Sequence, residues 1–171
     1  MPMQQIKKTC LLAFLLICCA ALAARAEVKV GEQFPDLASF KLEGNLPVLS
    51  KTNVVLVDFW ASWCGPCAES FPTMQELNTT YGPQGLIIIA VNEDDKKSDM
   101  DHFLQDHPVT ICVVRDAMHT LVAKANVSDI PSSFLIDQNG KISFAHSGFH
   151  GLKTAKEYQT EIESLLKRAQ K

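Results

Sequence analysis

The sequence lacks the features that mark several large classes of protein. Its 171 residues include 16 basic and 19 acidic side chains, with a net charge of −3 and no basic stripe, so nucleic-acid binding has no support. There is no internal repeat and no low-complexity tract, and the length suits one domain. The longest apolar run, residues 10–24, is shorter than the roughly 20 residues that a transmembrane helix needs.

Metal-ligand spacing is also missing. The chain has one C-x-x-C pair, Cys64 and Cys67, and a structural zinc site would need a second pair of ligands at comparable spacing. Cys112 stands alone between apolar residues and is interpreted as a buried structural thiol. The five histidines share no face at ligand spacing and are expected on the surface. We therefore expect no metal, and the C-x-x-C pair is interpreted as a redox pair.

Residues 1–26 have the pattern of a secretory signal peptide. Lys7 and Lys8 precede the apolar run, and Ala24-Arg25-Ala26 matches a small-x-small cleavage site. Cleavage there would leave residues 27–171 as the domain, in an oxidising compartment where disulfides persist. An uncleaved membrane anchor is the alternative.

A buried strand leads directly into the C-x-x-C pair. Residues 54–60 are rich in β-branched and aromatic side chains, as in a buried parallel strand. After Cys67 the apolar residues recur at a spacing of three, which predicts a helix to about residue 81. Cys64 then lies at the helix N-terminus, where unpaired N–H groups and the macrodipole favour a thiolate. Cys67 follows about one turn later and can close a disulfide with Cys64.

The remaining patterns predict an α/β domain. Strands are expected at residues 86–91 and 110–114. A further strand ending at Asp137 is joined by the turn residues Asn139-Gly140 to a strand at 141–145. Helices are expected up to about 107, at 117–125 and at 153–168. Residues 40–49 around Glu43-Gly44-Asn45 suggest a small hairpin, with an irregular arm as the alternative.

Residues 57–67, with Gly65-Pro66 between the cysteines, resemble the active-site stretch of thioredoxins. Residues 30–37 resemble the entry segment of the exported TlpA/ResA-like members of that superfamily, and Ile130-Pro131 matches the position of their cis-proline. The resemblance implies a thioredoxin-like fold, with a central mixed sheet flanked by helices. It also implies an added helix–strand unit between the second strand and Pro131.

The resemblance implies a role for each site residue. Cys64 would be the nucleophile, Cys67 would resolve the mixed disulfide, and Asp58 would accept the proton of Cys67. From its apolar neighbours alone, Asp58 is expected to be buried with a raised pKa, or else to face water from an edge strand. Substrate contacts are expected from Trp63, Gly65, Pro66, Ile130 and Pro131. No metal or organic cofactor is needed beyond the Cys64–Cys67 disulfide.

These roles lead us to expect an enzyme, periplasmic or otherwise exported, that reduces protein disulfides. Its electrons would come from a membrane thiol transporter of the DsbD/CcdA kind, and we expect a monomer. Two alternatives remain open: an oxidase or isomerase using the same pair, and a binding module in which the disulfide is static. Ser70 stands where ResA-like reductases carry a glutamate, with Glu69 one place earlier, which weakens a specific role in cytochrome c assembly.

Overall fold

The computed structural model describes residues 29–169, which form one mixed five-stranded sheet flanked by helices. The strand order is β3-β2-β1-β4-β5, with β1 parallel to β2, β2 parallel to β3, and the pairs β1–β4 and β4–β5 antiparallel. The strands are β1 Val54–Trp60, β2 Leu86–Asn92, β3 Cys112–Arg115, β4 Ser132–Ile136 and β5 Ile142–Ser147. This confirms the predicted α/β fold.

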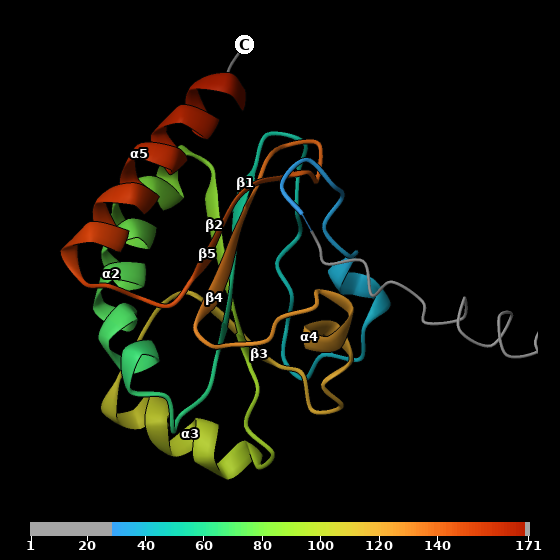
Figure 1. Cartoon of the computed structure of the whole chain (residues 1–171), viewed down its shortest axis with the longest axis vertical. Coiled ribbons are helices and arrows are strands. Elements are labelled where there is room, and N and C mark those ends of the chain that lie inside the picture. Colours follow the sequence, from blue (N-terminus) through green and yellow to red (C-terminus); the bar gives the residue numbers. More distant parts are fainter. Residues whose placement is uncertain (1–28, 170–171) are drawn as a thin grey trace, which may run out of the picture.

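The helices divide between the two faces of the sheet (Figure 1). Helices α2 (Gly65–Tyr81), α3 (Lys97–Asp106) and α5 (Leu152–Ala169) lie toward one face. The short helix α4 (Thr120–Lys124) lies toward the other, together with the N-terminal arm and its 3-10 turn η1 (Leu37–Ser39). A second 3-10 turn, η2 (Gly82–Gln84), joins α2 to β2. The unit α3–β3 is the predicted addition between the second strand and Pro131.

The central strand β1 supplies both faces of the core because side chains alternate along a strand. Leu56 and Trp60 pack in the cluster under α2 and α5, whereas Val57 and Phe59 pack in the cluster under the arm. All seven residues of β1 are buried. The ring of Trp60 lies 4.7 Å from that of Phe71 on α2, which seats the start of the helix against the end of the strand.

The predicted hairpin at 40–49 is wrong. Glu43 instead forms an isolated antiparallel bridge with Arg115 at the end of β3, and the Arg115 Nε donates to the Glu43 carboxylate at 2.9 Å. A long-range ion pair and backbone pairing therefore replace the local turn that Gly44-Asn45 suggested. The arm is irregular, as in the alternative interpretation.

The helix predicted at 117–125 is shorter than expected. Asp116 follows β3, and its carboxylate accepts the backbone N–H groups of Thr120, Leu121 and Val122. Residues 117–119 form the turn that this carboxylate closes, with His119 at φ +51°. The helix can begin only after that turn, at Thr120. The predicted signal peptide lies outside the described residues, and among residues 29–169 no helix is long and apolar enough to cross a membrane.

Candidate functional site

The turn between β1 and α2 places Cys64 at the N-terminus of the helix, as predicted. Cys64 is the N-cap residue of α2, and its sulfur accepts the backbone N–H of Cys67 at 3.2 Å. The two cysteines are joined by a disulfide with their Cα atoms 5.2 Å apart. Cys64 retains 5% exposure while Cys67 is fully buried, so Cys64 is the sulfur that an external group can reach. The same N–H groups that cap the helix would stabilise a Cys64 thiolate.

The loop before β4 lies against this pair. The Ile130-Pro131 bond is cis, and the carbonyl oxygen of Ile130 lies 3.7 Å from the Cys64 sulfur. Ile130 is half-buried and Pro131 is buried. Trp63, by contrast, is 73% exposed. The exposed apolar surface beside Cys64 therefore comes from Trp63, and substrate contact by Pro131 stays a prediction.

Gly65 and Pro66 lie on the exposed first turn of α2. Space is open around Gly65, where an added Cβ would meet no atom within 4 Å. The structure thus brings Cys64, Cys67 and Ile130 together and leaves the surface of the turn accessible.

Asp58 is buried in the central strand, and the alternative that it faces water from an edge strand is wrong. Its side chain lies on the same face of β1 as Trp60, under α2 and α5. Neither carboxylate oxygen has a hydrogen-bond partner among the described residues. Burial without compensating donors raises the pKa of Asp58 to about 8, because a desolvated carboxyl favours its neutral form.

Asp94 is a site residue that the sequence interpretation missed. Although it lies in a run of acidic residues between β2 and α3, it is 1% exposed. Its carboxylate accepts both the N–H and the hydroxyl of Ser62, two residues before Cys64, and also the side-chain amide of Asn92. The carboxyl ends of the parallel strands β1 and β2 meet at one edge of the sheet. A polar residue just after each of these strands is the sequence signal that could have identified Asp94. Asp94 therefore clamps the turn that carries Cys64.

A hydrogen-bonded glutamate–histidine pair lies next to this clamp. Glu93 and His119 are hydrogen-bonded, with 2.9 Å between the Glu93 carboxylate and His119 Nδ1. Burial raises the pKa of Glu93 to about 7, although the hydrogen bond with His119 acts in the opposite direction. The same hydrogen bond raises the pKa of His119. The backbone N–H of Glu93 donates to the Trp60 carbonyl at 2.8 Å, so this pair also borders the turn.

The structure also places the other residues that the sequence analysis discussed: Ser70, Glu69, Cys112 and the histidines. Ser70 is buried and its hydroxyl donates to the Cys67 carbonyl at 2.8 Å, whereas Glu69 is exposed, as expected for a different helix face. Cys112 is half-buried rather than buried, packs on the opposite face of the sheet, and has a pKa raised by burial. His107, His119 and His146 are half-buried, which corrects the expectation that all five histidines lie on the surface.

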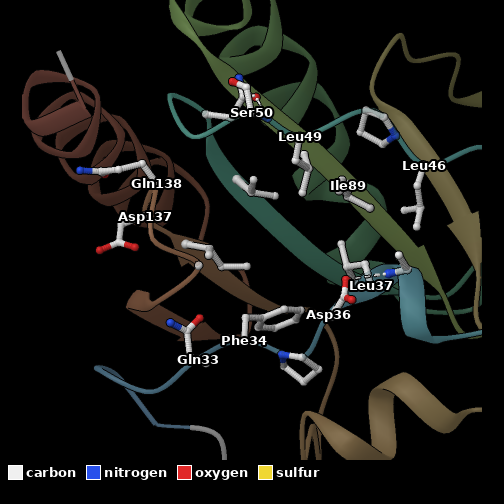
Figure 2. Close-up of a pocket in the computed structure, with 17 residues that line it drawn as sticks. Gln33, Phe34, Asp36, Leu37, Leu46, Leu49, Ser50, Ile89, Asp137 and Gln138 are labelled. Carbon is white, nitrogen blue, oxygen red and sulfur yellow. Dashed lines mark hydrogen bonds between the residues drawn. The ribbon is translucent and has the colours of Figure 1, made fainter.

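Figure 2 shows a cavity on the sheet face opposite the cysteines. It has a volume of about 460 Å³, and its apolar lining includes Leu37, Leu46 and Ile89. The carboxylates at its rim are engaged by the backbone: Asp36 accepts the Ala38 N–H, and Asp137 accepts two N–H groups of the β4–β5 turn. The cavity therefore lies outside the redox site. Across residues 29–169, no group of three or more His, Cys, Asp and Glu side chains is arranged to hold a metal.

A mixed sheet, a C-x-x-C disulfide at a helix N-terminus and a cis-proline loop beside it define a thioredoxin-like thiol–disulfide oxidoreductase. The comparisons with known proteins agree. The Redoxin family profile matches residues 29–162, and the chain belongs to that family.

Two curated relatives carry the same description, thiol-disulfide oxidoreductase ResA. The one from Geobacillus kaustophilus (strain HTA426) is 32% identical over 143 residues, covering 82% of this chain and 80% of the relative. The one from Bacillus subtilis (strain 168) is 30% identical over 125 residues, covering 72% of this chain and 70% of the relative. The chain is similar in structure to a Chlorobium tepidum protein assigned as the thiol:disulfide interchange protein DsbE. That match has a TM-score of 0.74 and 36% identity, over 81% of this chain and 99% of the other.

Proposed function

We propose that this chain is an exported enzyme that reduces disulfides in protein substrates. The observation that carries the proposal is the asymmetry of the pair: Cys64 is reachable at the helix N-terminus, and Cys67 is fully buried behind it. A reachable thiolate suits attack on an external disulfide, and a buried neighbour suits the second, internal step.

The reaction has two thiol–disulfide exchanges. The Cys64 thiolate attacks a substrate disulfide and forms a mixed disulfide, releasing one substrate sulfur as a thiolate. Cys67 then loses its proton to Asp58 and attacks the Cys64 sulfur, which releases the second substrate sulfur and leaves the Cys64–Cys67 disulfide. No metal or organic cofactor takes part. The Ile130 backbone supports an extended substrate segment by strand-like pairing, with Trp63 as its apolar contact.

The reductive direction is supported by Gly65-Pro66, the dipeptide found in thioredoxin. Thioredoxin has a reduction potential of about −270 mV, against about −120 mV for the oxidant DsbA. A reductant outside the cytosol needs a supply of electrons, and a membrane thiol transporter of the DsbD/CcdA kind would provide them to this monomeric domain. Export is supported by the signal-peptide pattern of residues 1–26.

Trapping tests the proposal. Cys67→Ser removes the resolving thiol, so the mixed disulfide on Cys64 should accumulate, and mass spectrometry of the trapped species identifies the substrate. The matched control is Cys112→Ser, which removes the distant thiol and should trap nothing. A measured reduction potential near that of DsbA would instead assign the chain as an oxidase. Failure to accelerate insulin reduction by dithiothreitol, together with no trapped partner, would leave a static disulfide in a binding module.

A further inference from the structure

Three polar residues lie at one register position across three neighbouring strands. Asp58 on β1 is directly opposite Ser133 on β4, and Ser133 is directly opposite His146 on β5. Directly opposed residues in antiparallel pairs have Cβ atoms about 4.5–5.5 Å apart on the same face. The three side chains therefore form a row that runs from the centre of the sheet to its edge strand, on the face that α5 covers.

Tyr158 of α5 lies over this row. Its hydroxyl is 2.8 Å from the hydroxyl of Ser133, and either oxygen can be the donor. Its ring packs edge-to-face on the ring of His146, with centroids 4.9 Å apart. Both Ser133 and Tyr158 are buried. Tyr158 thus contacts the middle of the row through a hydrogen bond and its outer end through ring packing.

The outer end of the row reaches solvent. His146 Nε2 is 2.7 Å from the carboxylate of Glu161, and its Nδ1 is 3.9 Å from that of Glu157. The side chain of His146 is 15% exposed and that of Glu157 is 41% exposed. Burial therefore decreases step by step from Asp58 to the surface.

The other surroundings of Asp58 offer no comparable path. On β1 its same-face neighbours are Leu56 and Trp60, and across the parallel pair it faces Ala90. The charged groups that act on Tyr158 are Asp58 from β1 and Glu157 and Glu161 from its own helix α5, and His146 from β5 lies against its ring. Ser133 is the polar side chain opposite Asp58.

We propose that Ser133, Tyr158 and His146 form the route by which the proton taken up by Asp58 reaches solvent, an inference that rests on the proposed function. In the resolving step the Cys67 thiol gives its proton to a carboxylate oxygen of Asp58. The sulfur electron pair forms the bond to Cys64, and the bond from Cys64 to the substrate sulfur breaks. Asp58 then passes one proton to Ser133 while Ser133 passes its own to Tyr158. The Tyr158 proton is taken up by His146, which gives up one proton through Nε2 to the carboxylate of Glu161 and so to solvent. The net result is one proton moved from Cys67 to solvent.

Ser133 is the movable member of this route. In the disulfide form its hydroxyl pairs with Tyr158, and Asp58 has no hydrogen-bond partner within residues 29–169. Rotation about the single bond χ1 moves a serine hydroxyl between staggered positions. Ser133 can therefore contact Asp58 and Tyr158 in turn, as a relay requires.

Stopped-flow kinetics with dithiodipyridine, a chromogenic disulfide, separates the two steps. The reduced protein releases one thiopyridone when Cys64 attacks and a second when Cys67 resolves. Tyr158→Phe removes only the hydroxyl and keeps the buried ring. Because general acid–base transfer contributes about 10²–10⁴-fold and Asp58 itself remains, we expect the second phase to slow about tenfold near pH 7. The first phase should keep its rate, and Ser133→Ala should give the same result.

Tyr81→Phe is the matched control. Tyr81, at the end of α2, is the other tyrosine and is also buried, and its hydroxyl donates to Glu163 of α5 at 2.8 Å, away from the row. Its removal should change neither phase. The route is wrong if both Tyr158→Phe and Ser133→Ala keep the wild-type second phase between about pH 6 and 9. If Tyr158→Phe fails to fold, as judged by near-ultraviolet circular dichroism, Ser133→Ala decides. A wild-type first phase no faster than that of free cysteine overturns the proposed function instead.

Discussion

Asp58 is a buried carboxyl group to which none of the described residues donates a hydrogen bond in the disulfide form. It lies in the middle of a fully buried strand, and both oxygens lack partners among the described residues. An ionised carboxylate is poorly stabilised there, so the neutral acid is favoured up to a pH of about 8. A group that changes charge near neutral pH can take a proton from Cys67 and return it in the next cycle.

Asp58→Asn should stabilise the oxidised protein in a pH-dependent way. The folded-state pKa of about 8 lies above the ordinary aspartate pKa of 3.8, so the folded state holds a proton that the unfolded state has lost between these values. Wild-type stability therefore falls as pH rises through this window, and the variant escapes that loss. We expect the advantage of the variant to be small near pH 4 and to reach several kcal/mol above pH 8, at about 1.4 kcal/mol per pKa unit. Urea unfolding across this range measures it.

The control for this prediction is Asp101→Asn. Asp101 is an exposed carboxylate paired with Lys97 on α3, and exposed ion pairs contribute little. Its effect on the free energy of unfolding should stay flat across the same window. If Asp58→Asn gave an equally flat profile, the carboxyl would titrate normally, and its assignment as the proton acceptor of Cys67 would lose its physical basis.

At the scale of elements, the turn between β1 and α2 is positioned by a neighbouring strand end. Asn92 ends β2, and Asp94 two residues later reaches across to Ser62. Arg115, at the end of β3, donates to the carbonyl oxygens of Asp94 and Asp95. Three consecutive parallel strands thus contribute to holding the segment that presents Cys64.

Removing the clamp should destabilise the protein in proportion to the hydrogen bonds lost. Ser62→Ala removes one hydroxyl donor and keeps the backbone N–H, so we expect a loss of about 1 kcal/mol. Asp94→Ala leaves the donors of both Ser62 and Asn92 unpaired in a buried place, so we expect about 3 kcal/mol. Thermal or urea unfolding of both variants and of the double variant measures the coupling.

Asp95→Ala is the matched control, because the Asp95 side chain is 93% exposed and its bond to Arg115 comes from the backbone. We expect its effect to stay within about 0.5 kcal/mol. Equal effects for Asp94→Ala and Asp95→Ala would contradict the clamp.

At the scale of the whole molecule, the sheet separates two cores. The face with α2, α3 and α5 carries the cysteines and Asp58, while the arm and α4 close the other face (Figure 1). The rings of Phe34 from the arm and Phe134 from β4 lie 5.4 Å apart, and Phe134 packs edge-on against Phe59 at 6.1 Å. The arm therefore contributes to stability from the face that does not carry the redox site.

Phe34→Ala should lower stability without changing the reactivity of Cys64. A fully buried Phe→Ala change costs about 3–5 kcal/mol, and because Phe34 is only half-buried we expect about 2 kcal/mol. Unfolding measures the loss, and the rate at which reduced Cys64 is alkylated should stay at its wild-type value. Val48→Ala, at a 95% exposed site on the same arm, should change neither quantity. A slower alkylation in Phe34→Ala alone would show that the two faces are coupled.

The elements that follow from local patterns could be predicted from the sequence. The β-branched run of β1, the apolar spacing after Cys67 and the turn at Asn139-Gly140 each specify an element within a few residues of themselves. The start of α4 was predicted too early, because the Asp116 carboxylate takes the N–H groups that a longer helix would have used. The hairpin around Gly44 was wrong for a related reason, since Glu43 found a partner 72 residues away.

By itself, the sequence determined the fold class and the redox pair at a helix N-terminus, because periodicity and turn chemistry act over short distances along the chain. The burial of Asp58 was decided by the central place of β1 in the sheet. The tertiary structure alone decided which polar groups meet. Asp94 reaches Ser62 because β1 and β2 are neighbours in the sheet, and Asp58, Ser133 and His146 align because of the register of β1, β4 and β5. The partner of a buried polar side chain depends on strand order and register, which no local pattern specifies.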